Sequence, residues 1–269
     1  MNRFNFMPQK KLTLAIVIPA FNEEGYLHHC LESVAAQTEP ADEVIVVDNN
    51  STDATAVVAK SFRFVKLLRE TRQGVVFARN RGFNSTTSDI IARIDADSRL
   101  PVDWVKRVKC EFKTSSLAAV TGPVCGYDLP LPALSWLPHH LLCLILKFVP
   151  PKHPFLFGFN MAVRREAWQA ISKKTHHSRQ FHEDIDLAIH LHQSGFKLAY
   201  TKDLLSAASG RRYSDRPSAF AKYMSTYCQT YTRHGYRDWA VYLTALIYWA
   251  GYVFYLPWAT RRLPRQHPM

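Results

Sequence analysis

The 269-residue sequence has little cysteine and no regular cysteine spacing. Its five cysteines stand at positions 30, 110, 125, 143 and 228, and no two are spaced as Cys-x-x-Cys. This argues against a disulfide framework or a cysteine-based structural zinc site and favours a reducing compartment. The chain also lacks internal repeats and low-complexity tracts. Its 47% hydrophobic and 21% charged residues exclude a disordered or fibrous protein.

Acidic residues and long N-terminal apolar runs are also scarce. The first apolar run, Leu12 to Ala20, is too short to cross a membrane, and no small-residue cleavage site follows, so we expect no signal peptide. Lys and Arg total 34 against 22 Asp and Glu, a net charge of +12. This charge predicts a polyanionic neighbour, which leaves nucleic acid, anionic lipid and phosphate-bearing substrates all open.

The N-terminal part alternates between strand and helix patterns. Apolar, β-branched runs at 12–19, 43–48, 64–68 and 89–95 predict buried strands, with a helix expected to begin at Asn22 and another over 75–84. Such alternation predicts a parallel sheet with helices on both faces, where ligands bind beyond the carboxyl ends of the strands. Polar pairs follow three of these strands: Asn22 and Glu23, Asp48 and Asn49, and Asp95 and Asp97.

The regular alternation ends after Val124. Residues 129–151 form a proline-bounded, mostly apolar segment, 158–168 predict a strand and then a helix, and a further helix begins near Glu183 and is closed by Gly195. Residues 239–260 carry no charge. That length fits a membrane span, an interfacial helix or a buried helix, and the sequence leaves the three open.

The Asp95-Ala96-Asp97 segment is the clearest sign of chemistry. Two carboxylates after a hydrophobic strand provide the hard oxygen ligands that Mg²⁺ and Mn²⁺ prefer, and such an ion can neutralise a departing diphosphate. Taken alone, the pattern also fits a solvated turn.

Six segments in order carry a resemblance to a known family. They are VIPAFNEE (17–24), VIVVDNNSTDAT (44–55), RQGVVFARNRG (72–82), IARIDADS (91–98), GFNMAVRREAW (158–168) and HEDIDLAIHLHQSG (182–195). Over residues 12–200 the chain resembles inverting nucleotide-sugar glycosyltransferases of family 2, which have the GT-A fold. The resemblance implies an α/β domain over 1–210, with a nucleotide-sugar half (12–125) and an acceptor half (126–210). An apolar helical extension (211–269) would follow.

The resemblance also implies site residues and partners. The donor is a nucleotide-diphosphate sugar, the acceptor a hydroxyl, and the cofactor Mg²⁺ or Mn²⁺. Asp97 would ligate the metal, and Asp184, paired with Glu183, would be the catalytic base. The implied donor-site residues are Pro19, Ala20, Asn22, Glu23, Asp48, Asn49, Arg79, Asp95, Arg211 and Arg212. Many relatives carry Asp where this chain has Asn49, which leaves the identity of the base open.

The apolar segments and basic charge predict a lipid-linked acceptor and attachment to the cytoplasmic face of a membrane. The histidines at 139–140 and 176–177 are predicted to be solvated loop residues, and His190 is given no role. Three other functions stay open: a nucleic-acid-binding protein, a nucleotidyltransferase and a catalytically inactive binding relative. The basic residues are spread along the chain with no recognisable binding module, so we expect no nucleic-acid partner.

Overall fold

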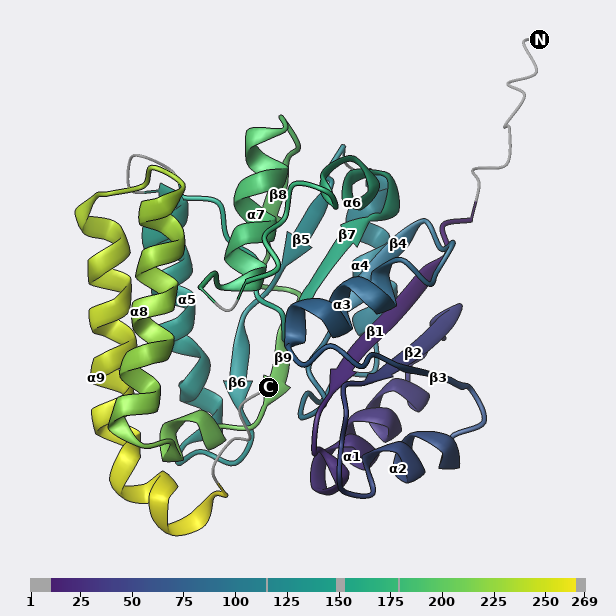
Figure 1. Ribbon diagram of the computed structural model, residues 1–269, viewed down its shortest axis with the longest axis horizontal. Helices are drawn as coiled ribbons and strands as arrows, with labels where there is room; N and C mark the ends of the chain where they lie inside the picture. Colours follow the sequence, from purple (N-terminus) through teal and green to yellow (C-terminus); the bar gives the residue numbers. More distant parts are fainter. Residues whose placement is uncertain (1–10, 115, 149–152, 179, 265–269) are drawn as a thin grey trace, which may run out of the picture.

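A mixed sheet flanked by helices forms the centre of the computed structural model, which describes residues 11–114, 116–148, 153–178 and 180–264 (Figure 1). Within these ranges seven strands pair in the order β3-β2-β1-β4-β7-β5-β8. Their bounds are β1 (Leu14–Ala20), β2 (Glu43–Asp48), β3 (Val65–Arg69), β4 (Ile90–Arg93), β5 (Ala119–Thr121), β7 (Met161–Arg164) and β8 (Leu198–Tyr200). The predicted α/β class is therefore confirmed.

The first four strands run parallel, as the alternating pattern predicts. Strand β7 is the exception, because it lies antiparallel between β4 and β5. It is the strand predicted over 158–168, and α6 (Arg165–Ile171) follows it directly. A short second sheet pairs β6 (Val124–Gly126) with β9 (Ser206–Ala208).

Both faces of the sheet are buried, which explains why the strands read as continuous apolar runs. Leu14, Ile16 and Ile18 of β1 pack toward α1 (Glu24–Ala35) and α4 (Trp104–Thr114), with α2 (Thr55–Ser61) alongside. Val17 faces the other side, where α3 (Val75–Phe83), α6 and α7 (Glu183–Gln193) cover the sheet. The period-two alternation of side chains in β1 thus supplies two separate cores.

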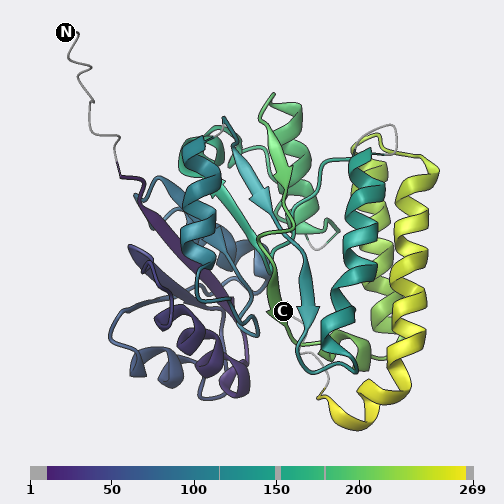
Figure 2. The same cartoon turned by 180° about the vertical axis from the view of Figure 1, so that it is seen from behind.

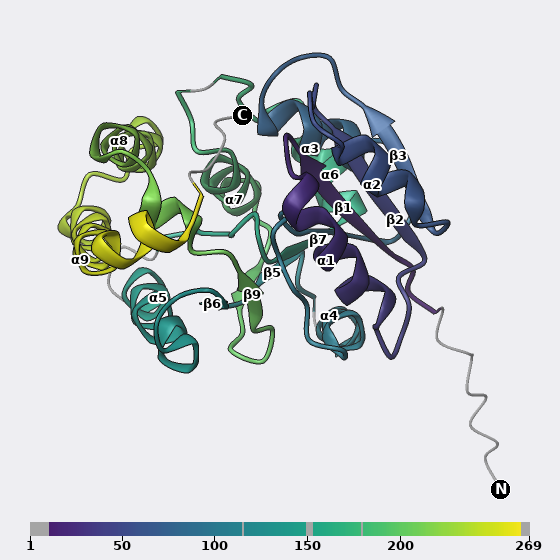
Figure 3. The same cartoon turned by 90° about the horizontal axis from the view of Figure 1, so that it is seen from below.

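Three long helices form a block beside the sheet: α5 (Pro132–Phe148), α8 (Pro217–Arg233) and α9 (Trp239–Arg262). Figures 2 and 3 show them side by side, with α7 between this block and the sheet. Ile185 and Ile189 of α7 join the aromatic core of the block, which includes Phe220, Tyr227 and Tyr252. Helix α7 therefore packs on the sheet with one face and on the helical block with another.

Two local expectations are wrong. Helix α1 is capped at Glu23, because Asn22 has a left-handed backbone (φ +54°) and lies outside the helix. The expectation of solvated loops is also wrong for His139 and His140, which lie in α5, where His139 is buried and His140 hydrogen-bonds Tyr200 (2.7 Å). His176 and His177 are exposed loop residues as expected, and they contact Asp186 and Asn80.

Candidate active site

The loops after β1 and β2 are held by hydrogen bonds from backbone N–H groups to side-chain oxygens. Pro19 and Ala20 end β1 inside the core. The left-handed turn at Asn22 lets its side-chain oxygen accept from the N–H of Thr52 (2.8 Å), and the N–H of Glu23 donates to Thr55 Oγ1 (2.7 Å). Asp48 accepts from the N–H of Ser51 (3.1 Å) at the end of β2. These contacts fix the strand-end loops where the sequence predicts the nucleotide.

The side chain of Asn49 is fully occupied by backbone groups. It is completely buried, its amide nitrogen donates to the carbonyls of Glu70 (2.9 Å) and Arg72 (2.8 Å), and its oxygen accepts from the N–H of Gly74 (2.7 Å). The resemblance implies a contact with the base or ribose for this residue. Its observed contacts hold the loop before α3.

Arg211 links two carboxylates from different strand ends. It belongs to a short 3-10 helix, η1 (Arg211–Ser214), and its Nη2 lies 2.5 Å from Glu23 Oε1 and its Nε 3.0 Å from Asp97 Oδ2. Its guanidinium also lies over the ring of Tyr26 (4.5 Å). The loosely matched basic segment of the sequence therefore reaches the predicted metal-binding carboxylate. Its neighbour Arg212 lies over the ring of Tyr223 (4.1 Å).

Negative charge at this point is only partly compensated. Burial raises the pKa of Asp97 to about 7, with Asp95 and Glu23 adding to the effect and Arg211 opposing it. Burial also raises the pKa of Glu23, and among the described residues its Oε2 is buried without a hydrogen-bond partner. Two buried carboxylates, Glu23 and Asp97, thus share the one guanidinium of Arg211, and Asp95 adds negative charge nearby.

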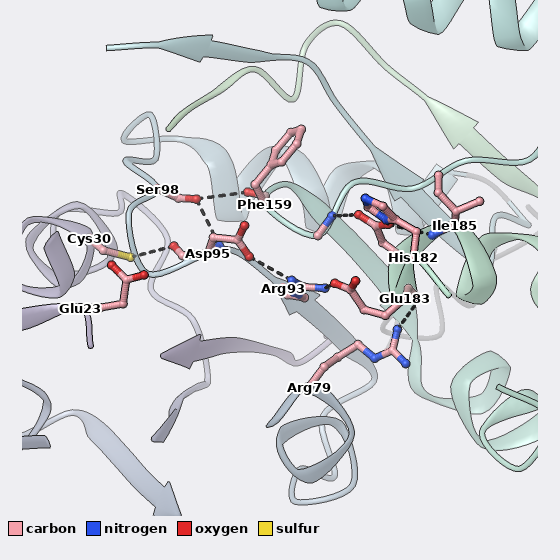
Figure 4. Close-up of polar contacts among 12 residues, drawn as sticks. Glu23, Cys30, Arg79, Arg93, Asp95, Ser98, Phe159, His182, Glu183 and Ile185 are labelled. Atoms are coloured by element: carbon pink, nitrogen blue, oxygen red, sulfur yellow. Dashed lines mark hydrogen bonds and ion pairs between the residues drawn. The ribbon is translucent and has the colours of Figure 1, made fainter. Parts of the chain in front are cut away.

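Arg93 joins the two acidic motifs, which lie far apart in the sequence (Figure 4). Its Nη2 lies 3.0 Å from Asp95 Oδ1 and its Nη1 2.6 Å from Glu183 Oε1, although Arg93 and Glu183 are 90 positions apart. Gly158 allows this arrangement, because a Cβ there would lie 2.4 Å from the Arg93 guanidinium carbon. Sequence reasoning missed Arg93, whose only signal is a lone charge inside an apolar strand.

Asp184 lies in the first turn of α7 with both oxygens hydrogen-bonded. The N–H of Gly158 donates to Oδ2 (2.9 Å), the N–H of Ile185 donates to Oδ1 (2.8 Å), and His182 Nδ1 also contacts Oδ1. Burial acts to raise the pKa of Asp184, but the His182 imidazole and the backbone donors outweigh it and lower the pKa. The structure therefore keeps this carboxylate ionised.

Arg79 contacts the first residue of the same helix, α7. It is fully buried, donates to the backbone carbonyl of Glu183 (2.7 Å) and lies over the ring of Trp168 (5.6 Å). Burial lowers its pKa to about 10. The resemblance implies a position for this residue at the base or the diphosphate. In the structure its contacts support the start of α7.

The sequence motifs at this site match those of a known protein family. The family model described as "Glycosyl transferase family 2" matches residues 15–171, which is more than half of the chain. The chain belongs to glycosyl transferase family 2. The match covers β1 to β7, the Asp95–Asp97 segment and Gly158, and ends before α7 and β8.

Named relatives share the same N-terminal region. The chain is 34% identical over 118 residues to "Glycosyltransferase AglE" of Haloferax volcanii, covering 41% of this chain and 39% of that protein. It is 30% identical over 97 residues to "Glycosyltransferase GlyA" of Streptococcus pneumoniae, covering 35% and 14%. The matched segments thus span less than half the length of these relatives.

Solved structures show the same fold. "Mannosyltransferase PcManGT from Pyrobaculum calidifontis in complex with GDP-Man and Mn2+" superposes with a TM-score of 0.66 at 19% identity, covering 95% of this chain and 75% of that one. Glucosyl-3-phosphoglycerate synthase from Mycobacterium tuberculosis, in complex with Mn²⁺, UDP and phosphoglyceric acid, gives 0.60 at 20% identity, covering 85% and 80%. The predicted GT-A architecture is therefore confirmed.

Proposed function

We propose that this chain is a metal-dependent inverting glycosyltransferase that moves a sugar from a nucleotide-diphosphate donor to an acceptor hydroxyl. The observation that carries this proposal is the Arg93 bridge, which brings the carboxylates after β4 and those at the start of α7 to one place. An inverting reaction needs a cation at the departing diphosphate and a base at the incoming hydroxyl, on opposite sides of the sugar.

The residues present fit a divalent cation. Asp97, Asp95 and Glu23 offer carboxylate oxygens, burial makes the charge on Asp97 unfavourable without a counter-ion, and Glu23 Oε2 has no hydrogen-bond partner among the described residues. Hard oxygen ligands suit Mg²⁺ and Mn²⁺. Asp97 would hold the ion, which when bound offsets the charge on the leaving diphosphate. The PcManGT and synthase structures, which contain Mn²⁺, support this assignment.

Asp184 is the proton acceptor in this proposal. The acceptor oxygen forms a bond to the anomeric carbon while the bond from that carbon to the diphosphate oxygen breaks, and the hydroxyl proton passes to the Asp184 carboxylate. The carboxylate is already ionised, since His182 and two backbone N–H groups stabilise its charge. Glu183, held by Arg93, fixes the first turn of α7 beside it.

The other donor-site assignments follow from this arrangement. Residues 12–125 would bind the donor, through the strand-end loops at Ala20, Glu23 and Asp48, and 126–210 would bind the acceptor. Arg211 and Arg212 would contact the diphosphate, which releases Arg211 from its two carboxylates. Asn49 would act indirectly by positioning the loop at 70–74.

A donor screen tests the reaction. The protein is incubated with UDP-, GDP- or dTDP-sugars and Mn²⁺ or Mg²⁺, and the released nucleoside diphosphate and the anomeric configuration of the product are measured. We expect Asp97→Ala to abolish metal-dependent release and Asp184→Asn to retain donor binding while losing transfer. Asp203→Asn, an exposed change away from the site, is the matched control. Pyrophosphate release would instead indicate a nucleotidyltransferase, and transfer at wild-type rate in either variant would remove that residue's role.

We further propose that the helical block binds the cytoplasmic face of a membrane and brings the enzyme to a lipid-linked acceptor. Within the described ranges, α9 is the one helix long and apolar enough to cross a membrane, by length and composition only. One side of it exposes Trp239, Tyr242, Leu246 and Val253. Phe254 is also exposed, and Arg261 and Arg262 follow in the last turn. Aromatic and basic residues together suit an anionic interface.

Vesicle binding tests the membrane proposal. Wild-type protein should co-sediment with anionic vesicles more than with zwitterionic ones, and the double variant Leu246→Glu/Phe254→Glu should lose this binding. Val57→Glu on α2 is the matched control, because Val57 is similarly exposed (69%) but lies on another part of the molecule. Equal binding by the double variant and the wild type would contradict the proposal.

A further inference from the structure

Three imidazoles surround one buried carboxylate on the side of α7 away from Asp184. Asp186 is fully buried, and its Oδ1 lies 2.7 Å from His176 Nδ1, 2.8 Å from His234 Nε2 and 3.5 Å from His190 Nε2. These four ligand atoms all lie within 4.8 Å of one another. Since Asp186 follows Asp184 by two residues, about 200° around the helix, the cluster is separate from the proposed active site.

The four residues come from three segments of the chain. Asp186 and His190 are four apart on α7 and so share one face of the helix. His176 belongs to the segment between α6 and α7, and His234 follows the last residue of α8. A ligand held by all four would fasten α8 and the preceding segment to the helix that carries Asp184.

The charge of this cluster is unbalanced when the imidazoles are neutral. The ion pairs that the structure gives Asp186 are all with histidines, which carry a positive charge only when protonated. A buried carboxylate needs a cation, and in this cluster a divalent metal ion would provide one without protonating an imidazole.

The distances among Asp186, His176 and His190, and from Asp186 to His234, fit a tetrahedral ion after a small adjustment. Zinc bonds of about 2.0–2.2 Å to nitrogen and oxygen place the ligand atoms of a tetrahedron about 3.3 Å apart. His190 Nε2 lies 3.5 Å from both Asp186 Oδ1 and His176 Nδ1, close to that value. The two shorter contacts to Asp186 Oδ1 must open by about 0.6 Å, which small side-chain rotations can supply.

The surroundings already orient the ligand atoms. The backbone N–H of His176 donates to Asp186 Oδ2 (2.8 Å), so that Oδ1 is the oxygen left facing the imidazoles. The ring of His176 stacks on Phe181 (3.9 Å between centroids), which also contacts the ring of His234 (5.8 Å). Outer contacts of this kind fix the orientation of metal ligands in proteins.

We propose that His176, Asp186, His190 and His234 form a structural zinc site that clamps α8 and the segment before α7 onto α7. Three imidazoles and one carboxylate favour zinc over Mg²⁺ and Ca²⁺, which prefer sites made of oxygen alone. Four protein ligands complete a tetrahedral site, as in structural rather than catalytic zinc centres. The site is independent of the Mg²⁺ or Mn²⁺ assigned to Asp97.

Metal binding by full-length protein without a histidine tag tests this site. The protein is stripped with a chelator, titrated with Zn²⁺ against a chromophoric competitor, and its zinc content is measured after dialysis. We expect one tightly bound zinc per chain and a higher melting temperature with zinc. His190→Gln and His176→Gln should each weaken binding by 10-fold or more. His176 is partly exposed, so its replacement also tests the site in a variant that keeps the fold.

Matched controls separate this site from other zinc binding. His192→Gln changes an exposed histidine at the end of the same helix, and His28→Gln removes an exposed histidine paired with Glu32 (3.3 Å). Both should bind zinc as the wild type does, and so should Asp97→Ala. No zinc retained after dialysis, or equal affinity in His176→Gln, His190→Gln and the wild type, would overturn the proposal. Failure of glycosyl transfer would leave it unaffected.

Discussion

Arg93 offers the sharpest test of how the two acidic motifs are held together. Its side chain is 4% exposed and pairs with Glu183, which is 14% exposed, and with Asp95, which is 39% exposed. Arg93→Met keeps much of the apolar stem but removes the charge. Glu183 then loses its only ion-pair partner among the described residues, whereas Asp95 can turn toward solvent.

The magnitude follows from burial. Removing one partner of a buried ion pair typically costs about 3–5 kcal/mol, because the remaining charge is left uncompensated. Solvation of Asp95 reduces this cost, so we expect Arg93→Met to lower the free energy of unfolding by about 3 kcal/mol. Arg93→Lys should fall between Arg93→Met and the wild type, since an ammonium cannot reach both carboxylates with a bidentate fork.

Urea unfolding at neutral pH measures the effect, and a double-mutant cycle isolates its cause. Adding Glu183→Gln to Arg93→Met removes the orphaned charge, so the double variant should recover at least about 1 kcal/mol relative to the sum of the single changes. Arg107→Met, which breaks a largely exposed pair with Asp103 (2.8 Å), is the control and should leave stability nearly unchanged. If the two single changes lowered the free energy of unfolding additively, or if Arg93→Met lowered it by less than about 1 kcal/mol, the stabilising role of the Arg93–Glu183 ion pair would be refuted.

Three further changes test other parts of the reasoning. Gly158→Ala should lower stability and transfer together, since its Cβ would meet the Arg93 guanidinium at 2.4 Å; equal melting temperatures would contradict this. Asn49→Asp places a carboxylate against two carbonyls and should cost about 2 kcal/mol or more in urea unfolding. Burial lowers the pKa of His139 to about 3, so the unfolded chain binds more protons between pH 3 and 6.5, and stability falls as pH drops through that range. His139→Leu should therefore remove about 2 kcal/mol of the destabilisation between pH 7.5 and 5, and unchanged pH dependence would count against it.

The pattern of apolar and polar residues is enough to predict the layered sheet and the edge at which its functional side chains gather. Strands buried on both faces need continuous apolar runs. The bounds predicted for β1, β2 and β4 therefore lie within two residues of the observed bounds. Parallel strands bring their carboxyl ends to one edge, which predicted that the residues following β1, β2 and β4 would gather. Six motifs, occurring in the same order as in the family, then indicated glycosyl transferase family 2.

Which polar side chains contact one another depends on the packing of segments that are distant in the sequence. The Arg93–Glu183 contact spans 90 positions and the His234–Asp186 contact spans 48, and no local period encodes either pairing. Asn22 took a left-handed turn because its oxygen is used by the N–H of Thr52 on a neighbouring loop. The histidine cluster was missed because its members come from three separate segments, and only the packing of α8 against α7 brings His234 to Asp186. Local sequence patterns report burial, whereas the partner of a buried charge depends on how distant segments pack.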